Sequence, residues 1–147
     1  MGAGTSSGTV GTVANALVKW ANVTTFIFNL VEDHDEADFK IRFQRWDHGD
    51  GVTFDRPRGV LAPAFSPMGE RFHFDADENW VVGVLPKLFE LETVALHELG
   101  HILGLGHSSN GDAIMFPNIG PGMIKGLSPD DIKGIRVLYN LNSCNTD

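Results

Sequence analysis

The sequence predicts a single α+β domain with about three helices and several short strands. The length of 147 residues suits one hydrophobic core. Apolar residues recur at helical spacing in three stretches, and alternating or β-branched stretches lie between them. No apolar run approaches the roughly 20 residues that span a membrane. The net charge of −8 argues against non-specific nucleic-acid binding, which needs a basic surface.

The first half of the chain predicts one helix and most of the strands. Residues 1–12 are expected to be a flexible leader, either natural or added in cloning. An apolar stripe that includes Val13 and Leu17 predicts a helix over 10–22. A loop rich in Gly, Asp, Pro and Arg is expected over 46–59. The strands are expected, in order, at 24–31, 39–43, 60–65 and 71–74.

The second half predicts two helices joined by a loop. Helical periodicity covers 89–103, and Gly104 is expected to end that helix. The last helix should begin after Ser128, which is a favourable N-cap, with Pro129 at the first helical position. A tail follows at 142–147. The buried stripe of the last helix is expected to be Ile132, Ile135, Leu138 and Tyr139.

One short segment, HELGHILGLGH at 97–107, predicts a metal site. His97 and His101 are four residues apart and therefore project from one face of a helix. Gly104 can take a positive φ, so the chain can turn sharply and bring His107 back to the same ion. Three neutral imidazoles with an open fourth position are typical of a catalytic zinc site.

The chemistry of such a site indicates peptide-bond hydrolysis. Zinc lowers the pKa of its water molecule and polarises a carbonyl oxygen. Glu98 is placed to take the proton of that water as general base and to pass it to the leaving amine. Two alternatives stay open: the H-E-x-x-H pattern could be incidental on a buried helix, or the site could bind zinc with little or no proteolytic activity.

The extended motif H-E-x-x-H-x-x-G-x-x-H, followed by a turn around Met115, resembles the metzincin signature. Ser108 after the third histidine resembles the matrixin branch. The chain thus resembles a matrix metalloproteinase catalytic domain over 13–141, most of all plant members. The resemblance implies a zincin-like α+β fold, with a mixed, mostly parallel twisted sheet and the H-E-x-x-H segment on the active-site helix. It also implies that Met115 lies beneath the zinc ligands and that the first strand of the family is missing here.

The resemblance implies two further metal sites. A structural zinc would use His48, Asp50 and His73, but Pro63 stands at the fourth ligand position, which leaves its occupancy open. Oxygen ligands from a flexible loop suit calcium. The calcium ligands implied are the carboxylates of Asp55, Asp75 and Glu78 and the backbone carbonyls of Arg56, Arg58 and Val60.

Substrate recognition and location are also implied by the resemblance. A peptide substrate, from an extracellular or cell-wall protein, would pair in extended form with an edge strand at 60–64. The apolar side chain just after the scissile bond would lie beside the zinc. The family implies secretion or a cell-surface location, a monomer, and inhibition by hydroxamates or protein inhibitors. The substrate-binding residues implied are Leu61, Ala62, Ala64, Thr93, Pro117, Asn118 and Ile119.

Overall fold

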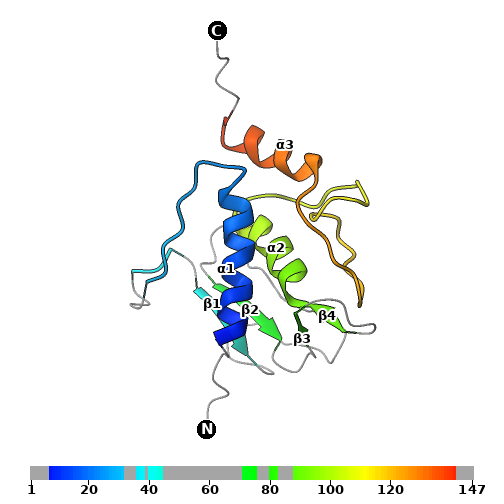
Figure 1. The fold of residues 1–147 in the computed structure, drawn as a ribbon. Helices are drawn as coiled ribbons and strands as arrows, with labels where there is room; N and C mark the ends of the chain where they lie inside the picture. The colour runs from blue at the N-terminus through cyan, green and yellow to red at the C-terminus, as the bar shows by residue number, and fades with distance from the viewer. Residues whose placement is uncertain are drawn as a thin grey trace.

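A computed structural model of the chain describes residues 7–31, 36–38, 40–44, 71–75, 80–82 and 88–141. Within those residues the chain forms three helices and two small parallel sheets (Figure 1). This arrangement agrees with the predicted α+β class. The expected loop at 46–59 and strand at 60–65 lie outside the described residues.

The first helix, α1 (Ser7–Ala21), begins earlier than the sequence predicts. The proposed leader boundary at residue 12 therefore falls inside a helix. Thr12 and Val13 are buried, at 5% and 7% exposure. Their burial against the core favours an ordered helix over the flexible chain that the glycine content of this region indicates.

The described strands pair in parallel. β1 (Lys40–Gln44) pairs with β2 (Arg71–Asp75), and both were predicted. A second ladder joins β3 (Trp80–Val81) to β4 (Phe89–Glu90). These two-residue strands are too short for a period-2 pattern to reveal them. Because Phe89 and Glu90 belong to β4, the next helix starts at Leu91 and not at residue 89.

The strand predicted at 24–31 is wrong. This segment follows α1 and has no regular secondary structure. Phe26 and Phe28 pack on the core, but Ile27 and Leu30 are 85% and 90% exposed. β-branched and aromatic residues form a strand only where a partner strand lies alongside, and in the described part of the chain this segment has none.

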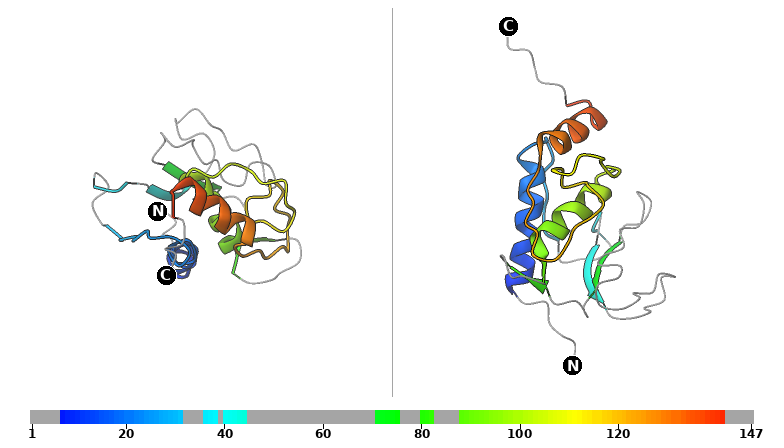
Figure 2. Two further views of the ribbon diagram at one scale, coloured as in Figure 1. Left: turned by 90° about the horizontal axis from the view of Figure 1, so that it is seen from above. Right: turned by 90° about the vertical axis from the view of Figure 1, so that its right-hand side faces the viewer.

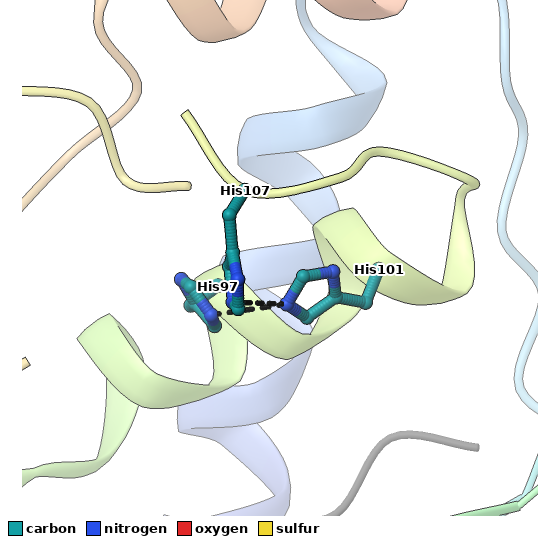
Figure 3. A group of neighbouring side chains, drawn as sticks. All are labelled: His97, His101 and His107. Atoms are coloured by element: carbon teal, nitrogen blue, oxygen red, sulfur yellow. Dashed lines mark hydrogen bonds between the residues drawn. The ribbon is translucent and has the colours of Figure 1, made fainter. Parts of the chain in front are cut away.

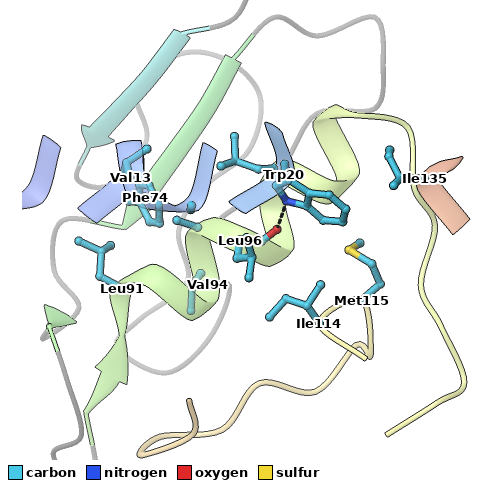
Figure 4. Close-up of a cluster of buried hydrophobic side chains, with 12 residues drawn as sticks. Val13, Trp20, Phe74, Leu91, Val94, Leu96, Ile114, Met115 and Ile135 are labelled. Carbon is cyan, nitrogen blue, oxygen red and sulfur yellow. Dashed lines mark hydrogen bonds between the residues drawn. The ribbon is translucent and has the colours of Figure 1, made fainter. Parts of the chain in front are cut away.

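The helix α2 (Leu91–Ile102) packs along α1, and together they contribute most of the described core (Figure 4). The indole of Trp20, fully buried on α1, donates a hydrogen bond of 3.0 Å to the backbone oxygen of Leu96 on α2. This contact fixes α1 against α2 next to His97. Among the described residues, no helix is long and apolar enough to cross a membrane.

The last helix, α3 (Pro129–Leu138), starts as predicted, with Ser128 as N-cap in a capping box with Asp131. Its predicted buried stripe is only partly right. Ile135 is fully buried, whereas Leu138 and Tyr139 are 51% and 42% exposed. α3 lies across one end of α1 and α2 (Figure 2), and of its predicted stripe only Ile135 is fully buried.

Candidate metal centre

The three histidines of the 97–107 segment converge on one point. Their candidate ligand atoms all lie within 4.8 Å of one another. The Nε2 atom of His101 lies 3.1 Å from Nε2 of His97 and 3.2 Å from Nε2 of His107. Figure 3 shows His97 and His101 projecting from α2, while His107 approaches from the chain that follows it. The sequence-predicted cluster is therefore present.

Backbone carbonyls fix the orientation of two of these rings. His97 Nδ1 lies 2.6 Å from the oxygen of Ile114, and His101 Nδ1 lies 2.8 Å from the oxygen of Leu105. A carbonyl can only accept, so in each ring Nδ1 carries the hydrogen and Nε2 keeps its lone pair. A carbonyl bound to the second ring nitrogen is the arrangement typical of histidine metal ligands.

The geometry fits a zinc ion. With bonds of about 2.0–2.1 Å at the tetrahedral angle, two nitrogen ligands of one zinc lie about 3.3–3.4 Å apart. The Nε2 separations of 3.1 and 3.2 Å are close to that value. The lone pairs of His97 and His101 face each other with no proton between them, and a cation would relieve that repulsion.

The protonation states also suit a metal ligand set. Burial lowers the pKa of His97 from 6.5 to about 4, and burial likewise lowers the pKa of His101. Both rings are therefore neutral at pH 7, which is the form that binds a metal. Exposure increases from His97, which is 4% exposed, to His107, which lies at the surface. The site is thus open on the side of His107.

Gly104 makes the approach of His107 possible. Its φ is +93°, a left-handed value that strains any residue with a Cβ. α2 has ended at Ile102, and the amide of Leu105 donates to the oxygen of Gly100 at 2.9 Å. The predicted turn at Gly104 is confirmed.

Met115 packs against α2. It is 2% exposed, and its side chain occupies the space that a Cβ on Gly100 would need. Gly100 therefore allows the methionine to pack directly against α2. The hydrophobic floor beneath the zinc ligands stays a prediction from the family resemblance.

Asp131 is a structural residue of the site that the sequence did not reveal. The residue is 2% exposed, and its carboxylate accepts hydrogen bonds from the amides of Ile114 and Met115, at 2.9 and 3.1 Å. It also accepts from the amide and hydroxyl of Ser128. Asp131 thus fixes the turn whose Ile114 carbonyl orients His97. An acid in the first turn of a helix is usually explained by the helix dipole, so its sequence position carried no signal of this second role.

Glu98 follows His97 on α2 and is partly buried. Burial raises its pKa from 4.5 to about 8. A carboxyl group with a pKa near neutrality can both accept and release a proton under physiological conditions. A cation bound at the neighbouring histidines would favour the ionised form.

The other predicted site residues are only partly described. Thr93 is 1% exposed and lies on α2, one turn before His97. Pro117, Asn118 and Ile119 follow the Met115 turn. For His73 and Asp75 the structure gives only their backbone positions on β2. Outside the described residues lie His48, Asp50, Asp55, Arg56, Arg58, Val60, Leu61, Ala62, Pro63, Ala64 and Glu78.

Comparisons with known proteins agree with this geometry. The sequence model of the family described as Matrixin matches residues 5–140. Metalloendoproteinase 1 of Glycine max is 46% identical over 137 residues, which cover 88% of this chain and 45% of that protein. Metalloendoproteinase 2-MMP of Arabidopsis thaliana is 47% identical over 137 residues, covering 88% and 36%. Stromelysin-3 of Rattus norvegicus is 45% identical over 131 residues, covering 87% and 26%. The chain therefore spans less than half the length of these relatives.

Proposed function

This chain belongs to the matrixin family, and on that premise we propose that it is the catalytic domain of a zinc-dependent endopeptidase. The observation that carries the proposal is the convergence of three imidazole nitrogens beside Glu98. His97, His101 and His107 would hold the zinc ion. When bound, zinc supplies Lewis acidity, which brings the pKa of a water molecule toward neutrality and polarises a carbonyl group.

The residues of the chain supply the proton transfers and the orientation. Glu98 accepts a proton from the attacking water at its carboxylate and delivers it to the nitrogen of the departing amine. The carbonyl of Ile114 keeps the His97 ring in the orientation and tautomer that the metal requires. Asp131 holds Ile114 in place. This division of roles requires no covalent intermediate.

The substrate is proposed to be a protein or peptide bound in extended form along the segment 60–64. An apolar side chain just after the scissile bond would lie between His97 and the loop that begins at Pro117, with Thr93 at its inner end. We propose secretion or a cell-surface location from the family. On the same ground we propose a calcium site and a second zinc site, formed by the residues that the resemblance implies, among them His73 and Asp75 on β2.

The test compares Glu98→Gln with Glu92→Gln, a matched substitution on the same helix. Both proteins, and the unchanged chain, are assayed for zinc content and for cleavage of a quenched peptide with Leu after the scissile bond. We expect one catalytic zinc in each, cleavage sensitive to a hydroxamate in the unchanged chain and Glu92→Gln, and a loss of at least about a thousandfold in Glu98→Gln. Full activity in Glu98→Gln would refute the role of Glu98. Bound zinc without any cleavage in the unchanged chain would favour a matrixin fold that is not a protease.

A further inference from the structure

We propose that Lys125 is a positioning residue that sets the selectivity of the side-chain site beside His97. This inference rests on the proposed protease function. Lys125 is remote from the sequence motif and lies at the far end of the loop that starts after the Met115 turn. That loop runs alongside α2 toward β4 before it returns to α3 (Figures 1 and 2).

The ammonium group of Lys125 joins the two ends of this loop. Nζ donates to the backbone oxygen of Gly111 at 2.6 Å and to that of Ala113 at 3.0 Å. It also lies 5.2 Å from the centre of the Phe116 ring, over its face. Both carbonyls and the ring belong to the chain that enters the loop, whereas Lys125 belongs to the chain that leaves it. The ammonium group of Lys125 therefore connects the two ends of the loop.

The backbone of Lys125 ties the same loop to the active-site helix. Its amide donates to Thr93 Oγ1 at 3.1 Å. The hydroxyl hydrogen of Thr93 is already committed, because Oγ1 donates to Glu90 Oε2 at 2.7 Å. A lone pair of Oγ1 is thus left to accept from Lys125. Glu90, which caps α2 and is 5% exposed, fixes the threonine rotamer in turn.

A second tie holds the middle of the loop. The amide of Gly122 donates to the oxygen of Leu88 at 2.8 Å, just before β4. Hydrogen bonds therefore hold the loop between Pro117 and Lys125 at its middle and at its end. The bond at its end is to Thr93, which lies one helical turn before His97. In the proposed mode of binding the substrate side chain lies between this loop and α2, so the distance between them would set the room for it. Loss of the Lys125 contacts should let the loop move outward and admit larger side chains.

The experiment uses Lys125→Met, which keeps the apolar stem over Phe116 and removes the ammonium group. Lys133→Met, on the exposed side of α3, is the matched control. Lys125→Arg keeps a cation with donors. Each zinc-loaded protein is given two quenched peptides that differ only in having Leu or Trp after the scissile bond. We expect the Leu-to-Trp ratio of kcat/KM to fall about tenfold in Lys125→Met, mainly through KM for the Trp peptide. The ratio should be unchanged in Lys133→Met, and in Lys125→Arg it should fall less than in Lys125→Met.

Hydrogen exchange gives a readout that does not depend on activity. The amides of Gly122 and Lys125 should exchange faster in Lys125→Met, while the amides of α2 keep their protection. An equal fall of kcat/KM for both peptides, or unchanged exchange at these amides, would overturn the positioning role and leave the protease function standing. A zinc-loaded unchanged chain that cleaves neither peptide would overturn the protease function, and the selectivity role with it.

Discussion

Replacing Asp131 by asparagine should destabilise the domain and weaken its zinc site together. One carboxylate oxygen accepts from the Met115 amide, and the other accepts from the Ile114 amide and from both Ser128 donors. An asparagine keeps a single acceptor oxygen. Whichever way the amide is turned, its NH2 group faces at least one backbone N–H at a site that is 2% exposed.

The magnitude follows from these bonds. A buried donor left without an acceptor costs about 1–3 kcal/mol, and a hydrogen bond to a charged group contributes about 1.5–3 kcal/mol. The Asp131→Asn variant would leave one donor unsatisfied and would weaken the remaining bonds by removing the charge. We therefore expect a loss of about 3–5 kcal/mol in the free energy of unfolding, or about two to four powers of ten in the unfolding equilibrium. Zinc affinity should fall about tenfold or more, because Ile114 then holds His97 less firmly.

Asp130→Asn is the matched control for this prediction. Asp130 is the preceding residue in the same first helical turn, but it is exposed and bonded to Ser108 Oγ at 2.6 Å. Both substitutions remove one negative charge from the helix N-terminus, so their difference isolates the buried hydrogen bonds. Urea unfolding followed by tryptophan fluorescence measures stability, and competition with a chelator dye measures zinc affinity. If Asp131→Asn loses less than about 1 kcal/mol more than Asp130→Asn, the structural role assigned to Asp131 is wrong.

Three other predictions concern the turn, the pH dependence and the exposed segment. Gly104→Ala, at φ +93°, should cost about 1–2 kcal/mol and lower zinc affinity in the same chelator competition. Without metal, the pKa of Glu98 is about 8 in the folded chain and 4.5 in the unfolded chain, so the free energy of unfolding falls as pH rises from 4.5 to 8. The pKa of His97 is about 4 in the folded chain against 6.5 in the unfolded chain, so His97 raises the free energy of unfolding over that range, but only up to pH 6.5. Urea unfolding in chelator should therefore show a fall of about 2 kcal/mol between pH 6.5 and 8 that Glu98→Gln abolishes, and an unchanged slope in that variant would contradict the assignment. Leu30→Ala should change stability by less than about 0.5 kcal/mol, whereas Leu96→Ala should cost about 2–5 kcal/mol; thermal melts that rank them the other way would disprove the burial pattern.

The sequence by itself determined which three histidines come together. The helical spacing of His97 and His101 and the glycine at 104 are local properties, and local geometry then places the ligands. The start of α3 was equally local, because the capping preference of Ser128 and Pro129 depends only on neighbouring residues. These predictions held because each depends on contacts a few residues apart.

Only the tertiary structure decided the features that join distant parts of the chain. A strand needs a neighbouring strand, so the strong β preference of 24–31 did not make it one. The packing of α1 along α2, which buries Val13 and Trp20 in the core, likewise joins segments that are far apart in the chain. The carboxylate of Asp131 and the ammonium of Lys125 likewise find their partners across the fold. Hydrogen bonds between residues distant in sequence leave no periodic trace in it, so they become visible only when the chain is folded.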